Sequence, residues 1–190
     1  SGSWPHFAGD NERVYFTARV PGTDYPEQQL VSVDLNGEDK REHLYGADKV
    51  QEYRLSHDKK WIAFVEQYNV YVAPFADLVK RQTINTRSKA LTIKKLSSRA
   101  GEYLNWSADN KTVSWFHGPR FFERDLKDAF DFIEGAPEEL PEPDKEGIDL
   151  SFKQKSDKPG GYKALVGGDI VTMKNADQLQ DVIKGGTAVS

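Results

Sequence analysis

Hydrophobic and polar positions follow one pattern at three places in the chain. The copies occupy residues 7–16 (FAGDNERVYF), 55–64 (LSHDKKWIAF) and 106–115 (WSADNKTVSW). Each copy has an apolar residue, an Asp three positions later, an apolar residue four positions after the Asp and another two positions after that. The Asp residues stand 48 and 51 positions apart. A period of about fifty residues in strand-like segments indicates stacked β-sheet units, each of which needs neighbours to bury its faces.

Each copy predicts two strands joined by a turn. The apolar residue before the Asp ends the first strand, and the Asp with its polar neighbours forms the turn, where its carboxylate can bond the backbone two residues on. The second strand alternates. In the second copy Ile62 and Phe64 point to one face of the sheet. Trp61, Ala63 and Val65 point to the other face.

Extending this alternation along the chain predicts three units of four strands, at residues 4–45, 50–96 and 102–155. The predicted strands, besides the two in the third repeat, are Trp4–Phe7, Arg13–Ala18, Leu30–Leu35, Lys40–Leu44, Val50–Leu55, Trp61–Glu66, Asn69–Ala73, Ala90–Leu96, Arg120–Leu126 and Ile148–Lys155. The pair Asn36-Gly37 predicts a two-residue hairpin turn between the third and fourth strands.

The connections differ in composition from the repeats. Lys127–Gly147 is rich in acidic residues and proline and is expected to be a loop, with a short helix at Asp128–Ile133. A Pro/Gly hinge is expected at 156–161, and 162–173 predicts two short strands around Gly167-Gly168. The last segment, 185–190, predicts the start of a strand without a partner.

Composition narrows the classes of function. The 190 residues are 37% hydrophobic and 29% charged with a net charge of −4, so a basic nucleic-acid footprint is not expected. No apolar run approaches the roughly eighteen residues that a membrane-spanning helix needs. The absence of cysteine excludes disulfides, cysteine-ligated zinc, iron–sulfur clusters and a thiol nucleophile. It does not fix the compartment.

The residues that could carry chemistry do not form a constellation in the sequence. The four histidines, His6, His43, His57 and His117, lack the spacings that bring two metal ligands together, so surface or structural roles are expected. The repeated residues Asp10, Asp58 and Asp109 are expected to serve the turns, because a residue present in every unit serves the unit. No catalytic, cofactor-binding or metal-binding residue is predicted.

Three further features have a structural interpretation beside a functional one. The hairpin His117–Phe122 is either a Gly-Pro turn with an exposed His and Arg, or a contact with a substrate or partner. The acidic run 138–146 is expected to be a solvated linker, since it lacks the spacing of an EF-hand calcium loop. The aromatic residues Trp61, Tyr68 and Tyr71 are expected to pack between sheets rather than bind carbohydrate.

The repeat Ser56-His-Asp58-Lys-Lys-Trp-Ile62-Ala-Phe64 resembles the Ser-x-Asp-x-x-x-Ile-Ala-Phe core of the TolB-type six-bladed β-propeller, a WD40-like repeat architecture. The tail, with its Ala164–Met173 segment followed by Gly185-Gly-Thr-Ala-Val, is similar to the opening strands of amidohydrolase-superfamily enzymes. A subgroup of that superfamily fuses a TolB-like propeller to an amidohydrolase barrel. The His-x-His pair that begins its metal site does not occur in this chain.

The resemblance implies an all-β fold in which residues 4–155 form a partial propeller of three four-stranded antiparallel blades and residues 156–190 begin a β-sandwich. It implies a non-catalytic accessory portion of a periplasmic or secreted hydrolase that acts on C–N bonds, with a divalent metal such as zinc held elsewhere in the parent protein. The alternative is a TolB-like scaffold that binds a protein. Three blades leave two end faces open, so either self-association into a six-bladed ring or a protein partner is expected, with no nucleic acid and no membrane.

Overall fold

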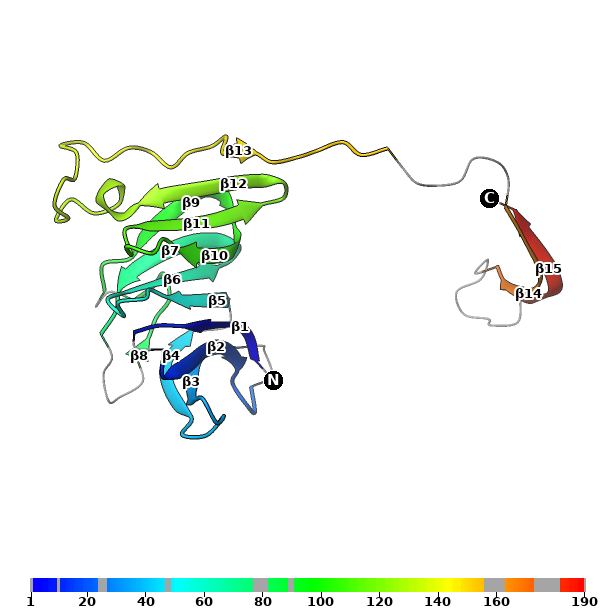
Figure 1. Cartoon of the computed structure of the whole chain (residues 1–190), viewed down its shortest axis with the longest axis horizontal. Coiled ribbons are helices and arrows are strands. Elements are labelled where there is room, and N and C mark those ends of the chain that lie inside the picture. Colours follow the sequence, from blue (N-terminus) through cyan, green and yellow to red (C-terminus); the bar gives the residue numbers. More distant parts are fainter. Residues whose placement is uncertain are drawn as a thin grey trace. The chain divides into compact units, whose positions relative to one another are not determined.

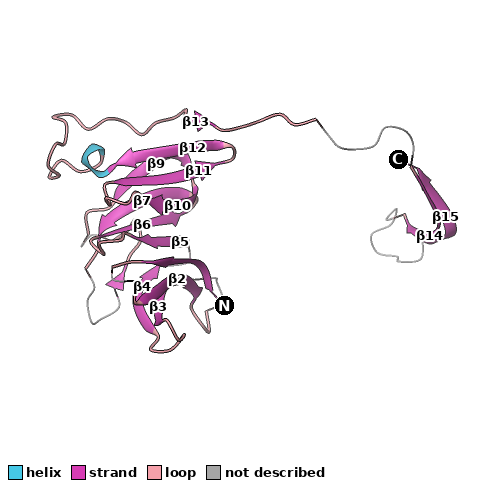
Figure 2. Ribbon diagram, viewed as in Figure 1, coloured by secondary structure: helices cyan, strands magenta, loops and turns pink. Residues whose placement is uncertain are grey.

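The computed structural model of the chain describes residues 2–9, 11–23, 27–46, 49–76, 82–88, 91–155, 163–172 and 182–189. Over these residues the protein is all-β, and its sheets are antiparallel except for one short parallel pair. Figure 2 shows strands and loops together with a single short helix, the 3₁₀ turn η1 (Leu126–Asp128). The chain divides into two compact units, Ser1–Ser151 and Phe152–Ser190.

Sheet 1 of the first unit contains five strands in the order β1-β2-β3-β4-β8. Their bounds are β1 (Gly2–Phe7), β2 (Arg13–Arg19), β3 (Gln28–Asp34), β4 (Arg41–Gly46) and β8 (Gln82–Thr83). The prediction of four strands is wrong here because β8, from the connection after β7, pairs parallel with β4. The next residue, Ile84, is fully buried in the same core as Leu44 and donates its N–H to Tyr45 O at 2.9 Å, which fixes the added strand.

Sheets 2 and 3 each contain four strands, in the orders β5-β6-β7-β9 and β10-β11-β12-β13. The strands are β5 (Val50–Leu55), β6 (Trp61–Glu66), β7 (Asn69–Pro74), β9 (Lys94–Ala100), β10 (Glu102–Trp106), β11 (Thr112–His117), β12 (Arg120–Asp125) and β13 (Ile148–Asp149). The predicted strands Val50–Leu55, Trp61–Glu66, Asn69–Ala73 and Arg120–Leu126 lie within one residue of β5, β6, β7 and β12, and β10 and β11 flank the turn of the third repeat.

The fourth strand of sheet 2 was predicted at Ala90–Leu96 but begins at Lys94. Ala90 lies outside the described residues. Ile93 packs against the core between sheets 1 and 2, whereas Leu96 is buried in the core between sheets 2 and 3. The apolar alternation that predicted one strand therefore combines a connecting segment and a strand that serve two different cores.

The fourth strand of sheet 3 is also shorter than the predicted Ile148–Lys155. Asp149 pairs with Arg120, the first residue of β12, so the residues beyond Asp149 run past the end of their partner strand. Phe152 is 84% exposed as a result. The helix predicted at Asp128–Ile133 is absent, and the 3₁₀ turn η1 directly after β12 stands near its place.

The β3–β4 connection lies at the predicted position but is longer than a two-residue turn. Asp34 closes it by accepting hydrogen bonds from the backbone N–H of Asn36 at 3.0 Å and of Glu38 at 2.7 Å. Gly37 adopts a φ of +83°, a left-handed conformation that glycine accepts without steric cost. The predicted Asn-Gly signal thus marks the turn correctly and its length incorrectly.

Sheet 2 lies between sheets 1 and 3, and both of its faces are buried (Figure 1). The core between sheets 1 and 2 contains Ala8, Tyr15, Leu30, Leu44, Val50, Tyr53, Leu55, Ile62, Phe64, Ala73 and Ile84. The core between sheets 2 and 3 contains Ala63, Val65, Val70, Val72, Leu96, Leu104, Trp106, Val113, Trp115, Phe122, Leu126, Ala129 and Phe130. The predicted division of β6 into two faces is confirmed, since Ile62 and Phe64 face sheet 1 and Ala63 and Val65 face sheet 3.

The second unit is a two-stranded antiparallel hairpin of β14 (Ala164–Val171) and β15 (Val182–Val189). The prediction of two short strands around Gly167-Gly168 is wrong, because β14 continues through both glycines with only an irregular register there. The prediction of an unpartnered last strand is also wrong, since β15 pairs with β14 along its length. The predicted hinge at 156–161 lies outside the described residues.

Candidate functional site

The turn of the second repeat is held by two side chains. Ser56 Oγ donates to Asp58 Oδ1 at 2.7 Å and accepts the backbone N–H of Trp61 at 3.0 Å. Asp58 Oδ1 also accepts the backbone N–H of Lys60 at 3.1 Å. These bonds close the turn between β5 and β6, as the sequence predicted for the repeated Asp.

The turn of the third repeat contains the same bonds. Ser107 Oγ donates to Asp109 Oδ1 at 2.6 Å, and the same hydroxyl accepts the backbone N–H of Thr112 at 3.0 Å. Asp109 Oδ1 accepts the N–H of Lys111 at 3.2 Å, and hydrogen bonds from Ser107 and Lys111 lower the pKa of its carboxyl. Asp10 of the first repeat lies outside the described residues.

The three turns also contact one another along the stack. The backbone N–H of Gly9, in the first turn, donates to His57 O in the second turn at 2.5 Å. The side chain of Asn110, in the third turn, accepts the backbone N–H groups of His57 at 2.7 Å and Asp58 at 3.3 Å. The second and third turns are therefore each fastened to the turn of the preceding sheet.

One position of the repeat contributes side-chain contacts between neighbouring turns. Asn11, Lys59 and Asn110, each directly after the repeated Asp, have φ values of 62°, 58° and 61°. The side chain of Lys59 lies over Gly9 of the preceding turn, so closely that a Cβ at Gly9 would collide with it. Asn110 reaches the preceding turn in the same direction. This left-handed position points a side chain onto the neighbouring sheet, and Asn and Asp tolerate the conformation better than most residues.

A second set of equivalent positions lies at the other end of the first strands. Trp4, Glu52 and Tyr103 each stand six residues before a repeated Asp. The pairing of β1, β5 and β10 shifts register at or next to these residues. Trp4 and Tyr103 have φ values of 59° and 60°, which bulky residues adopt only where the surrounding structure holds them. Their rings meet edge to face at 5.4 Å, so residues from sheets 1 and 3 touch at the strand of sheet 2.

A hollow of about 150 Å³ opens beside these irregular strands. It is lined by Trp4, Gln51, Glu52, Val65, Tyr68, Gly101 and Glu102, which we call the bulge pocket. Two carboxyl groups and two aromatic rings are among its walls. Tyr68 was predicted to pack between sheets, and this prediction is wrong, because it is 61% exposed at the β6–β7 turn. The prediction holds for Trp61 and Tyr71, which pack against the two cores.

Glu52 is the buried acid of the bulge pocket, with 2% of its surface exposed. Its Oε1 accepts the backbone N–H of Leu104 at 3.1 Å and lies 3.7 Å from an Arg54 guanidinium nitrogen. Burial raises its pKa from 4.5 to about 7, against the opposing attraction of Arg54. Near neutral pH this carboxyl can therefore accept or release a proton.

The structure places the histidines in different environments. His6 bridges sheets 1 and 2, where its Nε2 accepts the backbone N–H of Leu55 at 3.0 Å, and its Nδ1 lies 3.0 Å from Trp4 O. Burial lowers the pKa of His6 from 6.5 to about 4, so the ring is neutral at physiological pH. His57 and His117 are exposed.

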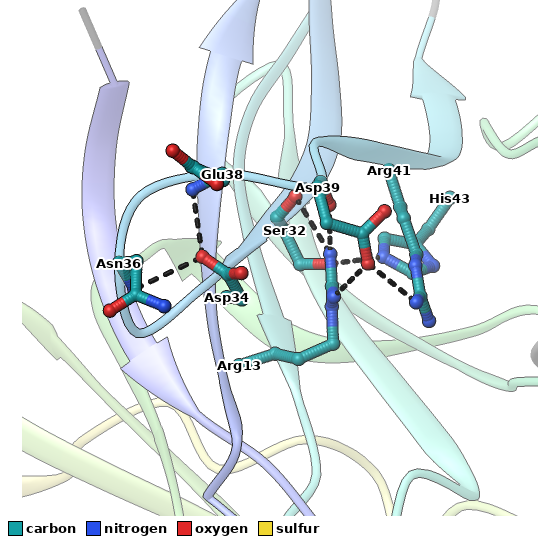
Figure 3. A network of polar contacts seen from close by, with 8 residues as sticks. All are labelled: Arg13, Ser32, Asp34, Asn36, Glu38, Asp39, Arg41 and His43. Carbon is teal, nitrogen blue, oxygen red and sulfur yellow. Dashed lines mark hydrogen bonds and ion pairs between the residues drawn. The ribbon is translucent and has the colours of Figure 1, made fainter.

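The fourth histidine belongs to a polar network on sheet 1, drawn in Figure 3. His43 is buried, and its Nε2 lies 2.7 Å from Ser32 Oγ. Arg13 donates through Nε to the same hydroxyl at 2.9 Å and forms an ion pair with Asp39 at 2.8 Å. Arg41 also pairs with Asp39, and the two arginines lower the pKa of that carboxyl. The network fastens the β3–β4 loop to β2.

The hairpin His117–Phe122 and the acidic run 138–146 contact each other through Arg120. Its guanidinium donates to Glu146 O at 2.5 Å and lies 3.6 Å from the carboxylate of Asp149. Asp144 closes the end of the acidic run by accepting the N–H of Glu146 at 2.9 Å. These contacts hold the acidic run against the hairpin, in agreement with the structural interpretation of both segments.

Sequence reasoning missed the bulge pocket. The register shifts in β1, β5 and β10 that bring Trp4 and Glu52 to the pocket depend on the stacked sheets and leave no local sequence signature.

Comparisons with known proteins identify no relative: no protein-family model and no curated protein matches the chain. Among the residues that the structure describes, no helix is long and apolar enough to cross a membrane. Nor do these described residues contain a group of three His, Asp or Glu side chains placed to hold a metal ion.

Proposed function

We propose that the three stacked sheets are blades of a TolB-like β-propeller arc that serves as a non-catalytic accessory portion of a metal-dependent amidohydrolase-like protein. The observation that carries this proposal is that each sheet packs on the sheet before it through the same positions of the repeat. In sheets 2 and 3 the motif residues face the preceding sheet, and the turns are fastened in the same direction by Lys59 and Asn110. Blades that stack by one repeated rule are typical of propellers.

The chemistry of the parent protein is proposed to lie outside these sheets. The repeated residues Asp58 and Asp109 each use Oδ1 to accept hydrogen bonds within their turns, which favours a structural role for them. The divalent metal, such as zinc, would be held by a barrel with a His-x-His pair, and the substrate class would be compounds with a hydrolysable C–N bond. A periplasmic or secreted location belongs to the same proposal.

A TolB-like protein-binding scaffold is the second candidate, and the bulge pocket favours it. Strained residues such as Trp4 and Tyr103 cluster at binding sites more often than at purely structural positions. The buried acid Glu52 lines the bulge pocket together with Trp4. If the protein is such a scaffold, the partner contacts the irregular parts of β1, β5 and β10.

The encoding gene decides between the two candidates. We expect the reading frame to continue past Ser190 into a barrel sequence that contains a His-x-His pair. The longer product, purified with zinc, is then expected to hydrolyse an amide or related C–N bond, whereas substitution of the two histidines abolishes the activity. A frame that ends shortly after Ser190 would contradict the accessory role and leave the scaffold.

A further inference from the structure

The motif residues define a front face on each sheet of the first unit. On sheet 2 the front face carries Leu55, Ile62 and Phe64, which pack on sheet 1. On sheet 3 it carries Trp106, Val113 and Trp115, which pack on sheet 2. Both observed contacts between sheets thus join the front face of one sheet to the back face of the sheet before it.

The front face of sheet 1 carries the equivalent residues Phe7, Val14 and Phe16. Phe7 pairs with Val14 across β1 and β2, so both side chains lie on the same face, opposite Tyr15 and the core. Phe7 is 47% exposed, and Val14 and Phe16 are only partly buried. No sheet covers this face among the residues that the structure describes.

The back face of sheet 3 is the opposite end of the stack. Phe116 and Phe121 pair across β11 and β12 with their rings 5.4 Å apart, and Ile148 of β13 pairs with Phe121 on the same face. The equivalents of Phe116 and Phe121 in sheet 2 are Val65 and Val70, which are buried against sheet 3. Ile148 is 57% exposed. One end of the stack therefore presents a front face and the other a back face, and these are the two kinds of surface that pack together at both contacts inside the stack.

The left-handed turn position adds a polar contact to the same arrangement. Asn110 binds the N–H groups of His57 and Asp58 on the preceding sheet. Asn11 has the same residue type and a φ within one degree of it, and it is exposed at the front of sheet 1. A preceding sheet would offer Asn11 the same pair of N–H groups.

We propose that a second copy of this chain supplies that sheet. The back face of sheet 3 in one copy packs on the front face of sheet 1 in the other, and Asn11 accepts the backbone N–H groups of Ala108 and Asp109, which are exposed and equivalent to His57 and Asp58. Each copy has one front and one back face, and in this proposal two copies close into a ring through two equal head-to-tail contacts instead of continuing as a filament. This inference rests on the proposed blade arrangement and names its partner.

The mass of the full chain in solution tests the proposal. Light scattering coupled to gel filtration at micromolar concentration is expected to give twice the 21.5 kDa of one chain. Phe7→Glu on the front face and Ile148→Glu on the back face are each expected to give monomers. Both side chains are about half exposed, so the circular dichroism spectrum of each monomeric variant is expected to match that of the wild type. Tyr68→Glu, at a 61% exposed position on the middle sheet, is the control and stays paired.

Mixing the two monomeric variants tests the direction of packing. Phe7→Glu retains an intact back face and Ile148→Glu an intact front face, so an equimolar mixture is expected to form a mixed pair through the one undamaged contact. Asn11→Gly keeps the left-handed turn and removes the amide, and it is expected to weaken pairing about tenfold.

Two results would overturn the proposal. A wild-type chain that remains monomeric excludes pairing, while leaving the gene-sequence test of the proposed function unaffected. A pair that survives Ile148→Glu but is lost in Phe7→Glu excludes front-to-back packing, because it shows two front faces in contact.

Discussion

Asn110 and Asp58 illustrate how single residues hold the stack together. Asn110 lies in the third turn, but its amide oxygen accepts two backbone N–H groups of the second turn. Such exposed turn groups could otherwise bond water, so the net gain is small per bond. The gain lies in fixing the order and direction of the sheets.

Removing the Asn110 amide is expected to weaken the contact between sheets 2 and 3. Asn110→Gly keeps the left-handed conformation and should lower the free energy of unfolding by about 1 kcal/mol, because two hydrogen bonds to the second turn are lost. Asn110→Asp is the matched control, since it retains an acceptor at the same place. Urea unfolding followed by tryptophan fluorescence measures both. Equal stability of the glycine variant and the wild type would mean that the contact contributes nothing.

Two buried titratable residues, Glu52 and His6, are expected to change the free energy of unfolding in opposite directions as pH changes. Glu52 has its pKa raised from 4.5 to about 7, so its stabilising effect is complete below pH 4.5 and is lost as pH rises toward 7. His6 has its pKa lowered from 6.5 to about 4, so its effect is complete above pH 6.5 and is lost as pH falls toward 4. Between pH 4.5 and 6.5 the two slopes have opposite sign.

Single substitutions separate these slopes. In Glu52→Gln the contribution of His6 remains, and the free energy of unfolding relative to wild type is expected to rise by roughly 1–2 kcal/mol from pH 5 to 6.5. In His6→Gln the contribution of Glu52 remains, and the free energy of unfolding relative to wild type is expected to fall by roughly 1–2 kcal/mol over the same interval. Unfolding in urea at the two pH values measures both variants against wild type. If the free energy of unfolding changes with pH in the same way in all three proteins, the shifted pKa values of Glu52 and His6 would be refuted.

At the scale of elements, β8 depends on a side chain that follows it. Only two residue pairs join β8 to β4, Leu44 with Gln82 and Tyr45 with Thr83. A parallel pair this short is not stable alone, so the burial of Ile84 beside Leu44 holds the strand in place. The bonds that Thr86 donates to the two carboxylate oxygens of Glu66 fasten the segment after it to sheet 2.

Ile84→Ala is therefore expected to release β8 from sheet 1. The substitution should cost about 2–4 kcal/mol of stability, as for other large-to-small changes in a core. Hydrogen exchange at the Ile84 amide, which is bonded to Tyr45 O, is expected to accelerate more than exchange within β2 and β3. Thr83→Ala, on an exposed neighbouring position, serves as the control. Unchanged exchange at position 84 in the alanine variant would show that the backbone pairing suffices.

The sequence predicted the elements that carry the repeat and failed where two elements compete for one segment. β5 and β6 were predicted to the residue because alternation and turn chemistry agree there. β8 and β9 were not, since Ile84 and Ile93 pack in the core between sheets 1 and 2 while Leu96 packs in the other core, and only the assembled sheets decide which. The bulge pocket was missed for a related reason: Glu52 becomes a buried acid only when Leu104 of the next sheet comes against it.

At the scale of the whole first unit, the three sheets share two cores, and sheet 2 contributes to both. Phe64 is fully buried between sheets 1 and 2, and its strand neighbour Val65 is buried between sheets 2 and 3. A disturbance of β6 therefore reaches both contacts. The hairpin of residues 164–189 belongs to the other compact unit and has its own strand pairing.

Phe64→Ala is expected to destabilise all three sheets together. The lost aromatic contacts with Tyr53 and Tyr71 and the cavity left behind should cost about 3–5 kcal/mol. Because sheet 2 joins the two cores, the fluorescence of Trp106 and Trp115 in sheet 3, recorded with Trp4 and Trp61 replaced by Phe, should change at the same lowered urea concentration as the circular dichroism of the whole chain. Phe152→Ala, at an 84% exposed position in the second unit, should leave that transition unchanged. Separate transitions for sheets 1 and 3 would mean that each sheet pair folds on its own, and that the stack is a chain of independent contacts instead of one cooperative unit.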